Sequence, residues 1–342
     1  MLLLLPLLLL ACAPLPHDSG LSAPIERLVP PCAGAALTAI ALAPHGRGWV
    51  ACGERLLGTA DAGRSFEVDS PTPRARIARL LPEPDGGLLA CGEDPERGGR
   101  LWRRARGGGW DPLLGRDDGD GLGACAQVAR MPQGPIAVCG AASPGLAVGG
   151  GGSAWHLPVG WVEGSEPPHV YDLVGTANGW AALGAGLTGP PSFLASVSSA
   201  ATLPLIAAVP DLGLEGELWA LATPDGGGIW VAGGRDPGGD DGPFAVLLRS
   251  TDRGVTWRPA ALPSGLGWLR AIAFAPDGHC GVAVGQRAAR GEGGFAVVSC
   301  DAGATWAEIP AALPSLGAAA ALDAGFLVGG EGGYLGRGWW PW

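Results

Sequence analysis

The sequence predicts an all-β protein assembled from one repeated sheet unit. The 342 residues include 61 Gly and 32 Pro, and only 16% of them are charged. This composition is typical of many short strands joined by tight turns and argues against long helices. Two recurring patterns, an apolar strand ending in Gly and an Asp-containing turn, indicate that the units resemble one another.

The apolar strand that ends in Gly occurs seven times. Successive copies begin about 46 residues apart, a period typical of propeller blades with four antiparallel strands. An apolar strand and a turn precede the copies, as in Leu37–Pro44 and Leu269–Ala275, so each copy is the second strand of its unit. The copies lie at 49–53, 88–92, 136–140, 180–184, 230–234, 281–285 and 326–330. We therefore predict a seven-bladed β-propeller of four-stranded antiparallel blades.

The last unit has room for only three strands before Trp342. A strand near Ile25–Val29 is expected to supply the fourth, so that an N-terminal strand closes the ring and covers a sheet edge. The C-terminal Trp339-Trp340-Pro341-Trp342 is expected to pack against the first blade, with an exposed aromatic platform for sugars as the alternative. In the fourth unit, around Leu194–Ala201, no Asp-containing turn is recognisable.

The Asp-containing turn follows the pattern Ser/Thr-x-Asp-x-Gly-x-Ser/Thr-aromatic. Its carboxylate is expected to accept hydrogen bonds from the backbone of the turn, and its Gly to adopt a positive φ. Its aromatic ring is expected to be buried between neighbouring sheets. All of these roles are structural. The defining residues are Thr59, Asp61, Gly63 and Phe66; Ser250, Asp252, Gly254 and Trp257; and Ser299, Asp301, Gly303 and Trp306.

This pattern resembles the Asp box, or BNR repeat, of sialidase-like and related β-propellers. The resemblance implies that the box lies on an outer turn, away from the ligand face. Sialidases also require three Arg, an Asp acid/base, a Tyr–Glu nucleophile pair and an Arg-Ile-Pro motif. Arg-Ile-Pro is absent, and only Tyr171 and Tyr334 could supply the nucleophile. The chain is more similar to non-catalytic propellers such as the photosystem II assembly and stability factor family, which implies a binding platform.

The N-terminus predicts export. Residues 1–11 form a short apolar run typical of a signal peptide, and Leu9-Leu10-Ala11-Cys12 resembles the bacterial lipobox, in which the Cys is lipidated. The run contains no Lys or Arg, so an ordinary cleaved signal peptide remains open. We expect residues 12–30 to be a lipid-anchored tether leading into the closing strand, and 31–342 to be the propeller. An outer-membrane or cell-surface lipoprotein is favoured over a periplasmic or secreted protein.

Eight Cys in an exported chain indicate disulfides. The best candidate pairs are Cys280 with Cys300 and Cys125 with Cys139, because each pair flanks an expected hairpin. For Cys52 and Cys91, a disulfide and a buried thiol remain equally open. No metal site or cofactor is expected: no C-x-x-C occurs and the five His are scattered.

The loops after the repeated strands are expected to surround the mouth of the central channel. The candidate binding residues there carry mixed charge, and nucleic acid is disfavoured as a ligand because the net charge is −10. We predict a monomeric, non-catalytic platform for a protein partner of the cell envelope. The alternative is a glycan-binding protein or a divergent sialidase-like glycosidase. The candidate mouth residues are Glu54, Glu93, Arg235, Gln286, Arg287 and Glu331.

Overall fold

The structure is a computed structural model. It describes residues 25–28, 32, 34–43, 46–69, 74–96, 98–114, 125–131, 134–139, 145–148, 169–176, 179–185, 193–198, 205–208, 216–224, 228–235, 242–252, 254–287 and 293–340. These residues form strands and one short 3-10 helix, η2 (Glu331–Gly333). None of their helices is long and apolar enough to cross a membrane.

The described strands form seven antiparallel sheets, and the first four follow in chain order. The first sheet contains β2 (Leu37–Leu42), β3 (Gly48–Cys52), β4 (Arg55–Thr59) and β5 (Glu67–Val68). The second contains β6 (Arg76–Pro82), β7 (Leu88–Asp94), β8 (Gly98–Arg104) and β9 (Trp110–Leu114). The third contains β10 (Cys125–Met131), β11 (Gly134–Cys139) and β12 (Gly145–Val148). The fourth contains β13 (His169–Thr176), β14 (Gly179–Ala185), β15 (Phe193–Ser198) and β16 (Leu205–Ala208).

The remaining sheets complete the series, and the last one joins the two ends of the described chain. The fifth contains β17 (Gly216–Ala222), β18 (Ile229–Arg235), β19 (Phe244–Ser250) and β20 (Arg258–Pro259). The sixth contains β21 (Trp268–Phe274), β22 (Gly281–Gln286), β23 (Gly294–Ser299) and β24 (Ala307–Glu308). The seventh has the order β25 (Leu316–Leu322), β26 (Gly325–Gly330), β27 (Leu335–Trp339) and β1 (Glu26–Leu28).

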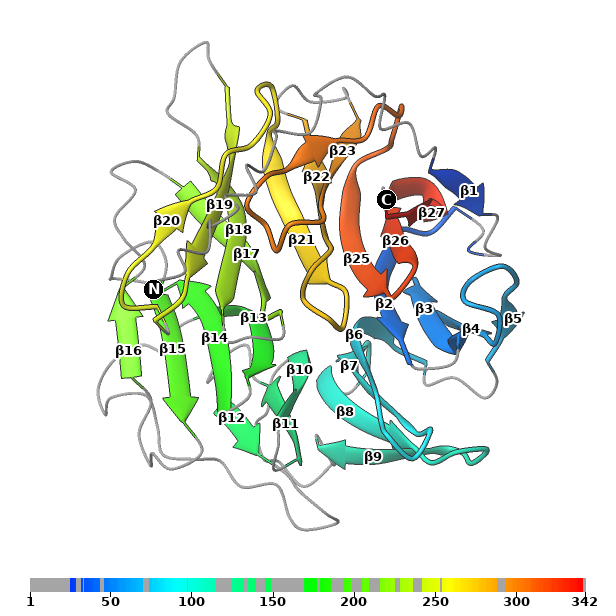
Figure 1. Ribbon diagram of the computed structural model, residues 1–342. Coiled ribbons are helices and arrows are strands. Elements are labelled where there is room, and N and C mark those ends of the chain that lie inside the picture. Colours follow the sequence, from blue (N-terminus) through cyan, green and yellow to red (C-terminus); the bar gives the residue numbers. More distant parts are fainter. Residues whose placement is uncertain are drawn as a thin grey trace, which may run out of the picture.

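The sheets follow one another around a ring (Figure 1). The first strand of each sheet is the innermost, and each inner strand contacts the inner strands of the two neighbouring sheets. Because β25 also contacts β2, the ring of inner strands is complete. The inner strands, in ring order, are β2, β6, β10, β13, β17, β21 and β25. The prediction of an all-β propeller fold is confirmed.

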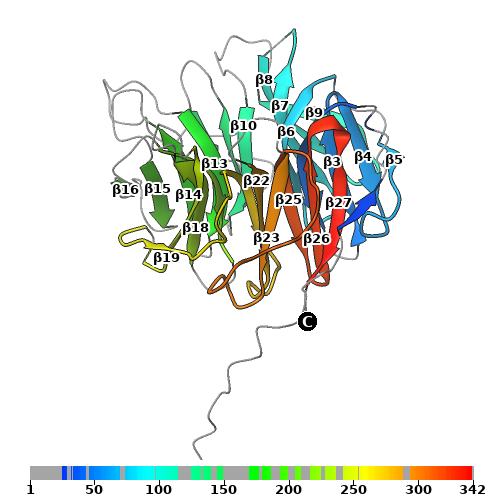
Figure 2. The ribbon, with the colours of Figure 1, turned by 90° about the horizontal axis from the view of Figure 1, so that it is seen from above.

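The ends of the described chain lie side by side. Figure 2 shows the red β27 next to the blue strands of the first sheet. Strand β1 pairs antiparallel with β27, with Arg27 opposite Gly336 and Leu28 opposite Leu335. The structure thus contains the closing strand that the sequence predicts at Ile25–Val29, and β1 covers the edge that β27 would otherwise expose.

The core lies between the sheets. Each cluster of buried apolar side chains combines residues of two adjacent sheets, such as Trp49 of β3 with Leu88 of β7. The repeated strands that end in Gly are the second strands of the sheets, and β3 and β26 are buried along their whole length. Neighbouring sheets cover both faces of these strands, which explains why their sequences are continuously apolar.

The C-terminal tryptophans differ from the prediction. Trp340 is buried, but its ring lies 5.1 Å from that of Phe326, in the cluster between the sixth and seventh sheets. Its indole donates a hydrogen bond to the carbonyl of Leu322 at 2.9 Å. The expected contact with the first blade is therefore wrong for Trp340, because its side chain packs on the face of the seventh sheet that the sixth sheet covers. Residues 341–342 lie outside the described residues.

Candidate functional site

Every inner strand carries a β-bulge near its start. At this position the pairing with the second strand skips one residue of the inner strand. A bulge bends its strand and redirects a side chain, and bulges are common beside binding sites. Since the inner strands form a ring, the seven bulges form a ring as well. The bulged residues are Thr38, Ala78, Ala126, Tyr171, Trp219, Arg270 and Gly317.

In four of the seven sheets, a glycine of the second strand lies against the backbone just before the bulge, at Gly92, Gly233, Gly285 and Gly330. A Cβ at Gly285 would lie 1.8 Å from the carbonyl oxygen of Trp268, just before the bulge at Arg270. At Gly233 the corresponding distance to the carbonyl of Glu217 would be 2.0 Å. The close backbone approach in these four sheets therefore requires glycine on the second strand. Cys52 and Cys139 occupy the equivalent positions of the first and third sheets.

A cavity of about 380 Å³ opens at the end of the channel where the bulges lie. We call it the mouth pocket. Six of the seven bulged residues line it, which shows that the bulges turn these positions toward one common space. The lining residues are Ala36, Leu37, Thr38, Ala78, Arg79, Gln127, Tyr171, Trp219, Arg270, Gln286, Ser315, Leu316, Gly317, Gly330 and Glu331.

One side of the mouth pocket is a closed polar network. Arg79 donates hydrogen bonds to Gln127 Oε1 at 2.6 Å and to Asp172 Oδ1 at 2.8 Å. Asp172 is buried, and its Oδ2 accepts a hydrogen bond from the backbone N–H of Leu221 at 2.7 Å. The network joins inner strands of the second to fifth sheets. Both charges are paired, so these groups hold the ring together.

The other side is aromatic and cationic. The rings of Tyr171 and Trp219 lie 5.3 Å apart, and the guanidinium of Arg270 lies 4.3 Å from the centre of a Trp219 ring. All three side chains are half-buried. Burial raises the pKa of Tyr171, and the nearby charge of Glu217 raises it further. This side offers flat apolar faces beside a positive charge.

The sequence-predicted mouth residues are only partly brought together. Gln286 and Glu331 line the mouth pocket, whereas Glu54 is in the β3–β4 turn and Glu93 is exposed on β7. Arg287 differs from the expectation, because its guanidinium forms a salt bridge with Glu308 on the outermost strand β24. The Arg235 side chain lies outside the described part of the chain.

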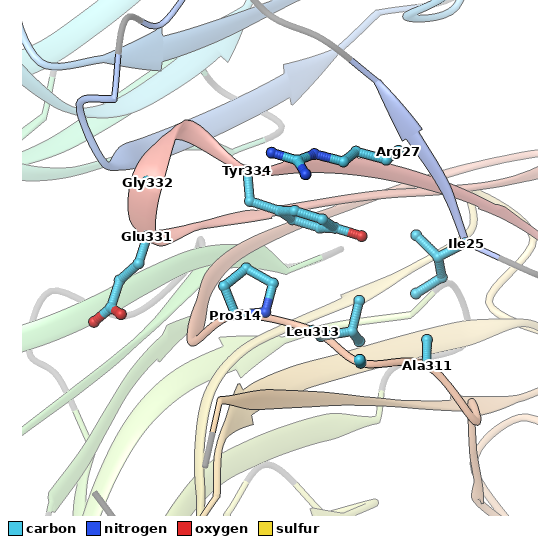
Figure 3. A pocket seen from close by; sticks show the side chains of 9 residues that line it. Ile25, Arg27, Ala311, Leu313, Pro314, Glu331, Gly332 and Tyr334 are labelled. Carbon is cyan, nitrogen blue, oxygen red and sulfur yellow. The ribbon is translucent and has the colours of Figure 1, made fainter. Parts of the chain in front are cut away.

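A second cavity, of about 360 Å³, lies beside the closing strand. Figure 3 shows Arg27 of β1 over the ring of Tyr334, with Ile25, Leu313 and Pro314 on the other sides. The Arg27 guanidinium is 5.9 Å from the ring centre. Burial raises the pKa of Tyr334, and the charge of Arg27 opposes that shift. Glu331 lines both cavities, so they are neighbours on the same face.

The Asp-containing turns lie on the opposite face. Each second strand ends at the mouth and the third strand runs back, so the turn that follows is at the far end of the sheet. Asp301 accepts hydrogen bonds from the backbone N–H and the hydroxyl of Thr305, at 2.9 and 2.6 Å. Gly303 has φ +82°, and Trp306 is buried against Trp230 of the preceding sheet. The turns at Asp61 and Asp252 have the same hydrogen bonds and positive-φ glycines.

The disulfide prediction for Cys280 and Cys300 is confirmed. A second disulfide, Cys32–Cys52, joins the segment after β1 to β3. Cys91 is disulfide-bonded as well, so neither of the two open cases is a free thiol. Cys125 and Cys139 are directly opposite in register, but their side chains and Cys12 lie outside what the structure describes. The described residues contain no cluster of three or more His, Cys, Asp or Glu placed to hold a metal.

Sequence reasoning missed the aromatic and cationic side of the mouth pocket. The signal was present in the first strands, where an apolar residue precedes each bulge, as Leu218 precedes Trp219 and Leu269 precedes Arg270. Aligning the seven first strands by that apolar residue brings the seven bulged positions into one column. The mouth residues predicted from the sequence belong instead to the ends of the second strands and the loops after them.

The ring of sheets and its inner strands define a β-propeller. No protein-family model and no curated protein matches the chain. Among solved structures, it is similar to YCF48 from Cyanidioschyzon merolae, with a TM-score of 0.64 and 17% identity over 92% of this chain and 98% of that chain. The structure of YCF48 bound to D1 peptide has a TM-score of 0.66 and 15% identity, over 93% of this chain and 97% of that chain. Virginiamycin B lyase from Staphylococcus aureus has a TM-score of 0.67 and 12% identity, over 93% of this chain and 99% of that chain. Identities this low establish the fold alone.

Proposed function

We propose that this protein is a non-catalytic propeller that binds a segment of a protein partner in the mouth pocket. One observation carries the proposal: the bulges of the inner strands bring Tyr171, Trp219 and Arg270 into one half-buried cluster. Aromatic side chains and Arg are the residues that contribute most to protein–protein binding. They supply apolar area and an orienting charge at a small cost in side-chain entropy.

The polar groups of the mouth pocket favour binding over proton transfer. The carboxylate of Asp172 accepts hydrogen bonds from Arg79 and from two backbone N–H groups, those of Leu173 and Leu221. Both of its oxygens are therefore already engaged by donors of the protein itself. Asp172 lies behind Arg79 and is not itself a lining residue. Among the described lining residues the one carboxylate is that of Glu331, which is exposed on η2.

The comparisons add support for a protein ligand. One similar structure is YCF48 bound to D1 peptide, a propeller that covers almost the same length of chain. A peptide is therefore a ligand that this architecture accommodates. The partner of the present chain is a separate question, because function depends on site residues and not on the fold.

We place this function at the bacterial cell envelope. The disulfides Cys32–Cys52 and Cys280–Cys300 support an exported protein, since disulfides persist in oxidising compartments. The apolar N-terminal run and Cys12 support lipid anchoring. The proposal is thus a monomeric envelope lipoprotein that presents its mouth pocket to a protein partner.

A pull-down from envelope extract tests the proposal. The bait is the exported chain, compared with Trp219→Ala and with the control Trp339→Ala, an exposed Trp that also has an Arg neighbour but lies outside both cavities. We expect a protein that Trp339→Ala retains and that, once purified, binds Trp219→Ala at least about tenfold more weakly. Retention of no protein, or equal loss in both variants, would contradict the proposal.

A glycan ligand is the alternative, and the Tyr171–Trp219 pair favours it, because sugars stack on such faces. A sialidase-like activity would use Tyr171 with Glu217 as its nucleophile pair. The raised pKa of Tyr171 opposes this role, since a nucleophile is activated by a lowered pKa. Binding on a glycan array, or sialoside hydrolysis that Tyr171→Phe abolishes, would establish the alternative.

A further inference from the structure

The two arginines of the mouth pocket differ in what they contact. Arg79 has two acceptors, Gln127 and Asp172. The contacts of Arg270 are aromatic: its guanidinium lies 4.3 Å from a Trp219 ring centre and 6.0 Å from one of Trp268. Within the described residues, Arg270 has neither a hydrogen bond nor a salt bridge. Its N–H donors therefore have no acceptor in the part of the chain that the structure describes.

Arg270 is also partly removed from water. Burial lowers its pKa, and the charge of Glu217 opposes that shift without a direct salt bridge. A half-buried cation with unused donors gains more from an anionic ligand than an exposed one does, because water screens the pair less. The two oxygens of a carboxylate can accept hydrogen bonds from two parallel N–H groups of one guanidinium. Stacking on Trp219 fixes the plane in which the guanidinium of Arg270 presents these N–H groups.

We propose that Arg270 binds a carboxylate of the partner segment, and that Trp219 and Tyr171 contact an apolar side chain next to that carboxylate. The inference rests on the proposed function and names the ligand chemistry. Two sources share this chemistry: an Asp or Glu side chain, and the carboxylate at the end of a chain. Arg79 does not compete for the ligand, because Asp172 already neutralises it.

Three pools of immobilised hexapeptides serve as probes. The first has one fixed Asp or Glu among random non-acidic residues and an amidated C-terminus. The second has Asn or Gln at the fixed position. The third equals the second but ends in a free carboxylate. The wild type is compared with Arg270→Gln, Arg270→Lys and the control Arg249→Gln, which removes an Arg 5.3 Å from a Trp230 ring, outside the mouth pocket.

We expect the wild type to bind the first or third pool about tenfold more strongly than the second, as a charge-assisted hydrogen bond allows. Arg270→Gln should abolish this preference and Arg270→Lys should retain part of it, while Arg249→Gln leaves it intact. Comparing the first and third pools identifies the source of the carboxylate. Thermal unfolding of each variant shows that it is folded.

Four other results overturn the inference. Equal binding of all pools, or an unchanged preference in Arg270→Gln, would leave the proposed function standing and exclude the carboxylate contact. Binding of none of the pools would count against both. If the wild type binds 3′-sialyllactose and none of the pools, the carboxylate belongs to a sugar and the protein ligand is excluded.

Discussion

Each Asp-containing turn is held by a carboxylate that accepts hydrogen bonds from a Ser or Thr four residues later. Hydrogen bonds from Ser65 lower the pKa of Asp61 from 3.8 to about 2, and those from Thr256 have the same effect on Asp252. At the scale of the residue, these turns are anchors of the sheet ends. Their aromatic residues then fasten each sheet to its predecessor, as Trp306 does against Trp230.

Acid should therefore weaken the fold through these turns. The folded-state pKa values lie below the unfolded ones, so the carboxylates stabilise the protein above about pH 4. This contribution is lost as the pH falls through about 2. Urea unfolding at pH 6 to 2 measures it. The double variant Asp61→Asn/Asp252→Asn should lose less of its free energy of unfolding between pH 6 and pH 2 than the wild type does. The exposed control Asp323→Asn should lose as much as the wild type. Identical acid sensitivity in all three would contradict the anchoring role.

The turn glycines should differ in their tolerance of a side chain. Gly303 has φ +82°, and a Cβ there would lie 2.3 Å from the Trp230 ring. Gly107, in the corresponding turn of the second sheet, has φ +71° and open space around it. We expect Gly303→Ala to cost roughly 2–4 kcal/mol and Gly107→Ala about 1 kcal/mol, measured by chemical denaturation. Equal costs would show that the Trp230 contact is unimportant.

At the scale of the element, a bulge and the glycine opposite it act as one unit. The glycine lets the inner strand approach closely, and the bulge turns a side chain into the mouth pocket. Gly285 pairs with Leu269, directly before Arg270. The repeated glycine and the candidate site are thus two consequences of the same backbone geometry.

Gly285→Ala should disturb this unit. The added Cβ would meet the backbone carbonyl of Trp268 at 1.8 Å, and we expect a loss of about 3 kcal/mol by chemical denaturation. The control is Gly317→Ala, at the bulge of β25, where a Cβ meets open space. That variant should stay close to the wild type, because alanine is less costly than glycine in a strand. A small effect of Gly285→Ala would contradict the requirement for glycine.

Much of the fold was predictable, and the site was predictable in small part. The period of the apolar strands and the Asp turns indicated the propeller, because sheets that repeat must repeat their turns and buried strands. The closing strand followed from a missing fourth strand in the last unit. The salt bridge of Arg287 was not predictable, because its partner Glu308 is distant in sequence. The bulges and the arrangement of the sheets in a ring bring together the side chains of Tyr171, Trp219 and Arg270. Patterns within single strands do not predict either feature.

At the scale of the whole molecule, the ring depends on the seam between β27 and β1. The disulfide Cys32–Cys52 fastens the segment after β1 to the first sheet, and Leu28 packs against residues of the first and last sheets. Separating this seam would expose a β-sheet edge. The seam is therefore the place where global opening of the ring should begin.

Two double variants test the seam. Cys32→Ser/Cys52→Ser and the control Cys280→Ser/Cys300→Ser each remove a disulfide with a sequence separation of 20. Each should lose about 3 kcal/mol of stability through the unfolded chain. Only Cys32→Ser/Cys52→Ser should also speed hydrogen exchange of the β27 amides, because this variant releases the segment after β1, the strand that pairs with β27. Equal exchange in both variants would exclude a special role for the seam.

The most direct test of the account is photo-crosslinking from inside the mouth pocket. Replacing Gly317 with p-benzoylphenylalanine places the reactive group in the pocket, where a side chain meets open space. The same replacement at Gly107, in a turn on the opposite face, is the control. In envelope extract, the account predicts a cross-linked protein from position 317 that the Trp219→Ala substitution removes, and none from position 107. Equal cross-linking from both positions, or from 107 alone, would contradict the claim that the mouth pocket is the binding site.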